Sequence, residues 1–344
     1  MSTPTEVRMV RSSERGTFKK CMQQWYWAYV EEIQPVNRKP GARDFGTGVH
    51  LALAEYYIPG KKRGKDLGET FTKWIDSEEK LSKAKIRVST DEETYDPKIF
   101  MDMKELGLLL LEEYEFIYGG DPHWEVIAPE IPFQAMINSE VVNLGTIDLV
   151  VRDLNDDQIK IVDHKTCGQF PNFDFLDLDD QCGSYSAIAQ TILRAKGLIG
   201  PKEIVRGMEY NYIRKGRPDE RPVNDEGLSL NKDGSVSKRQ PTPLMKRHFI
   251  RKTNAEKRRQ LERIVDDAKL MRMAANGDVP ILKSVSRDCT WCDFFQLCRI
   301  DESGGDTDMF KSRMFHRRDP YADHRDGAEN SKISVSTARK TRGR

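Results

Sequence analysis

The chain has 344 residues, with 56 lysines and arginines against 55 aspartates and glutamates, so its formal net charge is only +1 at pH 7. This balance excludes a protein that attracts nucleic acid through a uniformly basic field. The longest apolar run, residues 25–30, is far too short to cross a membrane. The first sixteen residues are charged and lack an apolar signal core, so we expect a cytoplasmic protein in a reducing compartment.

Basic residues are nevertheless concentrated in two segments. Residues 311–344 carry ten lysines and arginines against four acids, and residues 214–252 carry eleven against five. Each segment is a candidate contact for a phosphate backbone, and each is explained equally well as solvated polar chain. We expect residues 1–310 to form one domain and 311–344 to be a flexible basic tail.

In the N-terminal third, apolar residues recur at intervals of three and four, which is typical of helices with one buried face. The first predicted helix covers residues 12–33, begins at an N-cap on Ser12 or Ser13, and carries Cys21 on its apolar face. Further helices are predicted at residues 44–57, in the charged region that ends by residue 98, and at 100–118.

From residue 124 onward the apolar residues alternate, which favours strands. We expect strands at residues 124–137, 146–151, 159–162, 204–214 and 246–252. Helices are predicted at 178–196 and at 254–275, the second capped by Thr253 or Asn254. Residues 216–243 are rich in proline, glycine, serine and charge and are expected to form an insertion or loop. The pattern predicts an α/β fold with a mixed sheet flanked by helices.

The central feature is a predicted hairpin, in which the polar turn 155–157 joins two β-branched runs. Asp163 and Lys165 are two residues apart, so their side chains leave one face of the second strand, and Asp148 approaches from the first. In a metal-dependent phosphodiester hydrolase, two acids hold a cation that lowers the pKa of a bound water, and a lysine positions the water or neutralises the phosphate. The same residues on an exposed strand would be a solvated face, but apolar neighbours such as Val162 predict burial.

Four further polar residues are candidates, each with an ordinary structural alternative. His50 lies early in the helix 44–57 and is either a metal ligand or a hydrogen-bonded core residue. Glu130 lies within a strand and is interpreted as a bracing acid more readily than as a ligand. Gln181 and Tyr185 are four apart on one helix face, where they could contact phosphate, orient a carboxylate, or belong to the surface or core.

A cysteine cluster stands near the C-terminal end. Cys289 and Cys292 form a C-x-x-C pair, and Cys298 follows six residues later, which is a metal-site spacing. Cys21 is the best candidate for a fourth ligand, whereas Cys167 and Cys182 have no spacing pattern and are expected to be free thiols. All-thiolate ligation suits zinc or an iron–sulfur cluster, and the spacing does not separate the two.

Taken in chain order, these motifs resemble the RecB-type branch of the PD-(D/E)XK nuclease superfamily. The resemblance rests on His50, Asp148, the sequence from Asp163 to Lys165, and the pair of Gln181 and Tyr185. The four cysteines further resemble the iron–sulfur members of that branch, including four-cysteine CRISPR-associated exonucleases, AddB-type nuclease domains and related phage exonucleases. The similarity extends over residues 12–299, although Met22 stands where many relatives have proline and residues 216–243 have no counterpart.

The resemblance implies a restriction-endonuclease-like core whose N- and C-terminal segments are tied together by a 4Fe–4S cluster on Cys21, Cys289, Cys292 and Cys298, with structural zinc as the alternative. It implies that Mg²⁺ or Mn²⁺ is held by His50, Asp148, Asp163 and the main-chain carbonyl of His164. Lys165 would position or activate the attacking water, while Gln181 and Tyr185 would contact DNA or brace the site. Because an imidazole is a softer ligand than Mg²⁺ prefers, we expect Mn²⁺ to support activity at least as well.

The function implied is a metal-dependent exonuclease that hydrolyses single-stranded or frayed DNA ends in recombination, repair, replication or CRISPR adaptation, in the cytoplasm of a bacterium or a phage-infected host. Recombination or CRISPR-adaptation proteins are the partners that this role implies. One alternative is a non-catalytic DNA-binding or assembly module that keeps the fold and the cluster. Another is a zinc-stapled protein unrelated to nucleases, in which the motifs are a coincidence.

Overall fold

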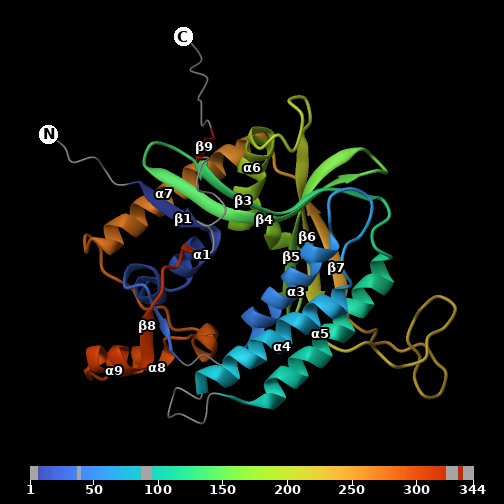
Figure 1. The fold of residues 1–344 in the computed structure, drawn as a ribbon, viewed down its shortest axis with the longest axis horizontal. Helices are drawn as coiled ribbons and strands as arrows, with labels where there is room; N and C mark the ends of the chain where they lie inside the picture. Colours follow the sequence, from blue (N-terminus) through green and yellow to red (C-terminus); the bar gives the residue numbers. More distant parts are fainter. Residues whose placement is uncertain (1–6, 37–39, 87–94, 323–331, 336–344) are drawn as a thin grey trace.

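The computed structural model describes residues 7–36, 40–86, 95–322 and 332–335. One mixed sheet forms its centre and confirms the predicted α/β class (Figure 1). Its strands lie in the order β7 (Met245–Ile250), β6 (Val205–Arg214), β5 (Gln158–Cys167), β4 (Val141–Asp153), β3 (Trp124–Met136) and β9 (Lys332–Ser334). A short strand, β1 (Arg8–Arg11), pairs in parallel with the beginning of β4.

The pairing directions follow from the lengths of the connections. Short turns join β3 to β4 and β4 to β5, and both of these pairs are antiparallel. The pair of β5 and β6 is parallel, which requires a crossover, and the helix α6 (Asp180–Ala195) supplies it. The chain that leaves β5 therefore runs through a short 3-10 helix, η3 (Phe173–Leu178), and α6 before it returns to the sheet as β6.

Helices cover both faces of the sheet (Figure 1). On one face, α3 (Ala42–Tyr56), α4 (Leu67–Ile86) and α5 (Pro97–Tyr118) share a buried core with Leu149 and Val162. On the other face, α6 and α7 (Asn254–Ala275) share a core with Val150 and Ile161. This alternation along β4 and β5 is the period-two pattern that the sequence predicts. No helix in the described part of the chain is long and apolar enough to cross a membrane.

The predicted helix 12–33 is wrong as a single helix. It divides into α1 (Ser12–Lys20), α2 (Met22–Trp25) and a π-helix, η1 (Tyr26–Val30), because Cys21 between the first two has an extended backbone with φ of −159°. The N-cap is Arg11, which makes no side-chain cap hydrogen bond, and not Ser12 or Ser13. Apolar spacing continues through Cys21 without interruption, so periodicity alone does not reveal the break.

Segments from the two ends of the chain lie side by side (Figure 1). The strand β2 (Ile33–Pro35) pairs with β8 (Phe315–Arg317), while α8 (Phe295–Glu302) and α9 (Thr307–Met314) pack nearby. Trp27 and Phe315 both contact the ring of Phe294, at centroid distances of 5.7 and 5.5 Å. We refer to residues 22–36 and 282–322 as the terminal lobe.

Beyond residue 310, where the sequence predicts a flexible tail, the residues that the structure describes form regular elements. Residues up to 317 belong to α9 and β8, and β9 joins the central sheet beside β3. Tyr321 is buried, and its hydroxyl donates to Glu14 at 2.7 Å. Residues 323–331 and 336–344 of the predicted tail lie outside the described residues, and the domain boundary itself stays a prediction.

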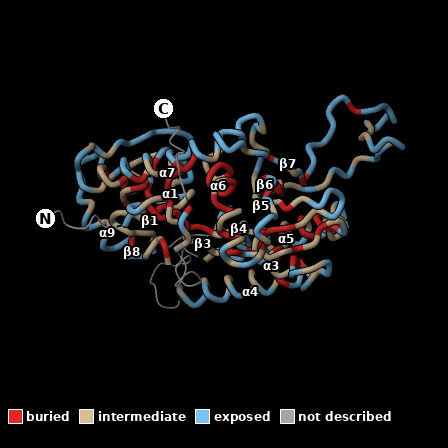
Figure 2. Tube along the Cα trace, turned by 90° about the horizontal axis from the view of Figure 1, so that it is seen from above, coloured by how far each residue is buried: buried red, intermediate tan, exposed pale blue. Residues whose placement is uncertain are grey.

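Residues 216–243 form a loop that projects from the body between β6 and β7 (Figures 1 and 2). Isolated bridges from Val223 to Ser229 and from Leu230 to Val236 give it some internal order. Arg214 at its base donates hydrogen bonds to the carbonyl groups of Thr242 and Pro243. The loop therefore has the irregular, exposed character that its composition predicts.

Candidate active site

The site lies where β4 changes its strand partner. On one edge of β4, β1 pairs with residues up to Leu144, and β5 pairs only from Leu149 onward. On that edge, residues 145–148 therefore have no partner among the described strands. A regular strand would place Ile147 and Leu149 on one face, but these two side chains pack in different cores. This difference shows that β4 bends between them.

Asp148 lies at the end of this gap, and its carboxylate contacts one residue of β5 and one residue of α3. Its Oδ2 accepts a hydrogen bond of 2.9 Å from the main-chain N–H of His164, which has no ladder bond to β4 at this point. The same oxygen lies 3.4 Å from Nδ1 of His50 on α3. The carboxylate thus fixes β5 against β4 where the ladder stops, and faces the imidazole that the sequence identified.

Glu130 on β3 faces the same point from the other side. Its backbone has φ of 45°, a left-handed conformation that is uncommon for a non-glycine residue, and it interrupts the pairing of β3 with β4 opposite Asp148. One ligand atom each from His50, Glu130 and Asp148 lie within 4.8 Å of one another. The sequence favoured a bracing role for Glu130, whereas the structure places its carboxylate among the candidate metal ligands.

Asp163 and Lys165 lie together on β5, as the strand period predicts. The ammonium group of Lys165 is 2.5 Å from Oδ2 of Asp163, and Gln181 of α6 donates to Oδ1 of Asp163 at 2.8 Å. Asp163 is 1 % exposed, whereas the side chain of Lys165 is 35 % exposed. Burial opposes the charge on Lys165, but the carboxylates of Asp163 and Asp148 raise the pKa of its ammonium group, which stays protonated.

Tyr185 fills the gap beside β4. Its hydroxyl accepts a hydrogen bond from the main-chain N–H of Thr146, and the side chain of Gln181 contacts the same hydroxyl. A Cβ atom at Gly145 would come within 2.7 Å of that oxygen, so only glycine leaves room for the ring. Both residues predicted on α6 thus meet the hairpin, with Gln181 on the acid and Tyr185 on the strand.

A buried polar network behind the site was missed by sequence reasoning. Nδ1 of His164 lies 2.8 Å from the amide nitrogen of Asn211, and that amide also donates to the hydroxyl of Tyr114 at 2.9 Å. Arg247 donates to Asp121 and to Tyr114. Burial, reinforced by the charge of His50, lowers the pKa of His164 well below its ordinary value, so the imidazole is neutral. No spacing in the sequence connects these residues.

The donor set fits a divalent cation. Although the Glu130 side chain is exposed, the loss of water around its carboxyl group, together with the charges of Asp148 and Asp163, raises the pKa of Glu130 to about 8, and burial raises the pKa of Asp163. Carboxylates that repel one another in this way are stabilised as anions by a cation between them. His50, Glu130 and Asp148 are the residues gathered most closely, with Asp163 held nearby by Lys165 and Gln181.

These pKa shifts predict a strong pH dependence of cation binding. Because the pKa of Glu130 is raised to about 8, its carboxyl group carries a proton near neutral pH in the metal-free protein, and a cation must displace that proton. We expect the affinity for Mn²⁺ to rise about tenfold or more between pH 6 and pH 8, with proton release. Calorimetry in two buffers of different ionisation enthalpy measures both quantities, and Glu130→Gln should release fewer protons. Equal affinity at the two pH values contradicts the prediction.

The raised pKa values also determine whether the stability of the metal-free protein rises or falls with pH. An acid whose pKa is raised on folding binds more protons in the folded chain than in the unfolded chain. The metal-free protein should therefore lose stability as the pH rises from about 4, the unfolded pKa of an acid, to about 8, the pKa of Glu130. A bound cation offsets that loss.

A groove of about 850 Å³ runs between the terminal lobe and the helices α3 and α4. Gln24 and Tyr29 line it on the lobe side, and Thr47 and Trp74 line it on the helix side. Thr47 is about one helical turn before His50, so the groove reaches the rim of the site. It is lined by both polar and aromatic side chains.

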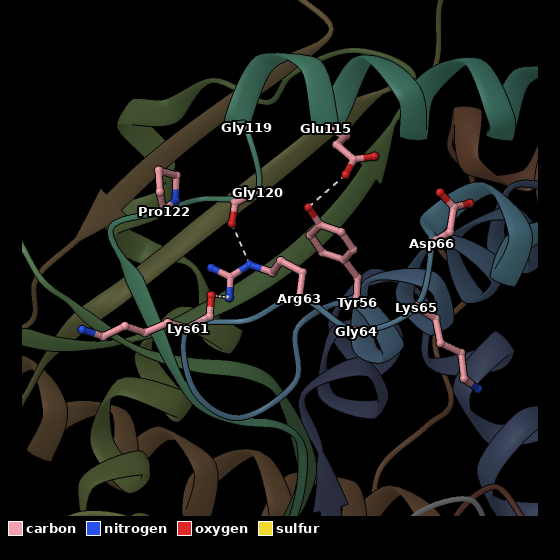
Figure 3. A pocket seen from close by; sticks show the side chains of 10 residues that line it. All are labelled: Tyr56, Lys61, Arg63, Gly64, Lys65, Asp66, Glu115, Gly119, Gly120 and Pro122. Atoms are coloured by element: carbon pink, nitrogen blue, oxygen red, sulfur yellow. Dashed lines mark hydrogen bonds between the residues drawn. The ribbon is translucent and has the colours of Figure 1, made fainter.

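A smaller cavity of about 520 Å³ lies at the other end of α3 and contains none of the predicted site residues (Figure 3). Its basic side chain Arg63 donates to the carbonyl groups of Gly120, Asp121 and Trp124, beside the C-terminal end of α5. Arg63 therefore fastens the loop after α3 to the chain between α5 and β3, and the cavity is not part of the candidate active site.

The predicted cysteine ligands lie in one region but do not form a compact metal site. Lys20 and Asp288, each next to one of these cysteines, form an ion pair of 3.2 Å. Burial is the largest cause of the raised pKa values of Cys292 and Cys298, and the neighbouring thiols of Cys21 and Cys289 raise them further. Within the described chain, however, no three cysteine sulfur atoms lie within 4.8 Å of one another, and all six cysteines are free thiols.

A mixed sheet with acids, a lysine and an imidazole at the break of its central strand is the arrangement of a nuclease core. The model of the PD-(D/E)XK nuclease superfamily matches residues 13–299, most of the chain. The chain therefore belongs to the PD-(D/E)XK nuclease superfamily, and this membership indicates a metal-dependent nuclease. A comparison with curated proteins finds no match.

Proposed function

We propose that this protein is a metal-dependent exonuclease that hydrolyses DNA phosphodiester bonds at single-stranded or frayed ends. The observation that carries the proposal is the convergence of Asp148, Asp163 and Lys165 with His50 and Glu130 at the gap in β4. Three acids and an ammonium group at one point are costly to keep without a charged ligand. A cation and a phosphodiester together supply that ligand.

Each residue has a distinct role in the proposed reaction. His50, Glu130 and Asp148 would hold the cation with Asp163, and a cation there supplies charge stabilisation for the phosphate and a water of lowered pKa. The protonated ammonium group of Lys165 orients that water and neutralises charge that develops on the phosphate oxygens. Gln181 holds Asp163 in place through the hydrogen bond to Oδ1.

The groove beside α3 supports a single strand as the substrate. It leads to the rim of the site and offers polar side chains for the backbone and aromatic rings, such as Tyr29 and Trp74, for unpaired bases. Membership of a recombination, repair, replication or CRISPR-adaptation pathway, with partners from it, is an extension of the same proposal. A cytoplasmic location agrees with a substrate of this kind.

The test is degradation of DNA with Mn²⁺ or Mg²⁺ by the anaerobically purified chain and by Asp163→Ala. End-labelled linear single strands, circular single strands and blunt duplexes are compared. Loss of the linear single strand by the parent alone supports an exonuclease, and cleavage of the circle shows an endonuclease. Because His50 is a soft ligand, Mn²⁺ should support activity at least as well as Mg²⁺. Two inert proteins that still bind DNA would favour a non-catalytic DNA-binding or assembly module.

We further propose that Cys21, Cys289, Cys292 and Cys298 hold a 4Fe–4S cluster that ties the ends of the chain together. Thiolates around a single zinc ion lie roughly 4 Å apart, given a Zn–S distance of about 2.3 Å. Among the described residues no three cysteine sulfur atoms lie within 4.8 Å of one another, which does not fit a single zinc ion, whereas a cubane of four irons separates its thiolates more widely. The extended backbone at Cys21 and the ion pair of Lys20 with Asp288 support its approach to the other three.

Metal analysis tests the cluster directly. The anaerobically purified protein should contain iron and acid-labile sulfide and absorb visible light, and Cys21→Ser should lose most of both. Cys167→Ser is the matched control, because Cys167 is a free thiol at the end of β5 that is not among the proposed ligands, and this variant should keep the metal. Zinc in place of iron, or full iron content in Cys21→Ser, contradicts the proposal.

A further inference from the structure

Between β5 and α6, the 3-10 helix η3 (Phe173–Leu178) exposes two apolar side chains near the candidate active site. Residues three apart share a face of such a helix. On the inner face, Leu176 is buried and Phe173 packs against Tyr212 with ring centroids 5.6 Å apart. On the outer face, Phe175 and Leu178 are 68 % and 73 % exposed. We call these two outward side chains the η3 ridge.

Hydrogen bonds hold the η3 ridge on a fixed element. The side chain of Asn172 caps the start of η3, and the ammonium group of Lys252 donates to the carbonyl group of Asp177. At the other end, the carboxylate of Asp179 caps α6 and accepts a hydrogen bond of 2.5 Å from the hydroxyl of Tyr210. Because the backbone of η3 is already ordered, the protein loses little conformational entropy when a ligand covers the ridge.

A row of side chains connects the catalytic pair to this element. Lys165 pairs with Tyr212 across β5 and β6, and Tyr212 pairs with Lys246 across β6 and β7, so the three side chains lie on one face of the sheet. Lys246 is exposed, and its ammonium group lies 4.2 Å from the centre of the Phe173 ring. The sheet face that carries Lys165 therefore carries a second cation, Lys246, which lies against Phe173 of η3.

We propose that Phe175, Leu178 and Lys246 form a subsite for an unpaired nucleotide of the substrate strand, next to the phosphate that is cleaved. Phe175 stacks on the base against Leu178, and Lys246 binds the phosphate, the combination by which proteins hold single strands without reading sequence. The position of the cleaved phosphate at Lys165 rests on the proposed function. A protein partner would also cover an apolar ridge, but the two lysines on this face of the sheet, Lys165 and Lys246, favour a polyanion, with its phosphate at Lys246 and away from the exposed Asp174 and Asp177 of η3.

Binding without catalysis is the first test. In EDTA, the full chain is titrated with an oligodeoxythymidylate that contains 2-aminopurine, at several salt concentrations. Phe175→Ala should weaken binding about five- to tenfold and reduce the quenching of 2-aminopurine, and Phe175→Trp should restore both. Lys246→Ala should lower the slope of log K against log salt by about 0.7, the contribution of one phosphate on a single strand. Controls are Phe116→Ala, at an 84 % exposed phenylalanine on α5, and Lys232→Ala in the projecting loop.

Hydrolysis provides the second test, through the ratio of kcat/KM for the oligonucleotide to that for a small nitrophenyl phosphodiester. Phe175→Ala should lower this ratio about fivefold, because only the oligonucleotide reaches the subsite. Equal losses on both substrates would assign the η3 ridge a merely structural role and overturn the proposal. Binding by Phe175→Ala and Lys246→Ala that matches the controls would overturn it too, and would leave the ridge for a protein partner. If the parent hydrolyses neither substrate but both variants bind DNA more weakly than the parent, the subsite proposal stands and the proposed reaction fails.

Discussion

Lys165→Met should lower kcat for DNA hydrolysis at least about 100-fold while binding of DNA in EDTA changes little. The substitution keeps most of the apolar stem but removes the ammonium group that lies 2.5 Å from Asp163 and that, in the proposed function, neutralises charge on the phosphate. The charge is important because the neighbouring acids raise the pKa of Lys165 and keep it protonated throughout the working range. Single-turnover rates with saturating Mn²⁺ measure the effect on the chemical step.

Lys160→Met is the matched control for this experiment. Lys160 lies on the same strand and pairs with Asp153 and Glu209 at 3.2 and 2.9 Å, but it stands five residues away on the opposite face. Its loss should reduce stability and leave the rate of hydrolysis near that of the parent. Comparable rate losses in both variants would mean that the sheet, and not the ammonium group of Lys165, controls activity.

Arg247→Met should lower the free energy of unfolding by about 3–5 kcal/mol, the typical cost of removing one partner of a buried ion pair. The guanidinium group donates to both oxygens of Asp121, which is buried, and lies over the rings of Tyr118 and Trp124. Without it, the buried Asp121 carboxylate keeps the hydrogen bond from the hydroxyl of Tyr57 but loses its cationic partner. Urea unfolding followed by tryptophan fluorescence measures the loss.

An exposed ion pair gives the contrast. Arg217 pairs with Glu105 at 2.5 Å, but both side chains are more than half exposed, so Arg217→Met should change stability far less than Arg247→Met does. Adding Asp121→Asn to Arg247→Met should recover part of the loss, because the unpaired charge is removed. A loss in Arg247→Met no larger than that in Arg217→Met contradicts the burial argument.

The sequence predicts those helices and strands well whose formation depends on neighbouring residues, such as a capping box or an alternating strand. The helix α7 begins after Thr253 as expected, because Thr253 and Glu256 form a capping box that the sequence displays. The strands β4 and β5 follow the predicted alternation around their polar turn. The short strands β1 and β9 were not predicted, because four and three residues carry too little pattern and their pairing partners are distant in sequence.

The residues of the candidate site likewise include some that the sequence predicts and some that it does not. Asp148, Asp163 and Lys165 follow from the hairpin, since strand period and pairing decide which side chains converge. Glu130 was given too little weight, because the left-handed backbone that turns it toward His50 is set by the bend of the sheet and not by its neighbours in sequence. Asn211 and Arg247 were missed because their contacts join β6 and β7 to helices far away in the chain.

The pairing of β2 with β8 has a consequence for the order of folding. It joins positions as far apart as Ile33 and Arg317, so the terminal lobe is a contact of very high sequence separation. During synthesis, the strands and helices that carry His50 to Tyr185 leave the ribosome long before β8 does. The terminal lobe wall of the groove is therefore assembled last, and a chain that stops short of β8 would display its acids without the wall that directs a strand toward them.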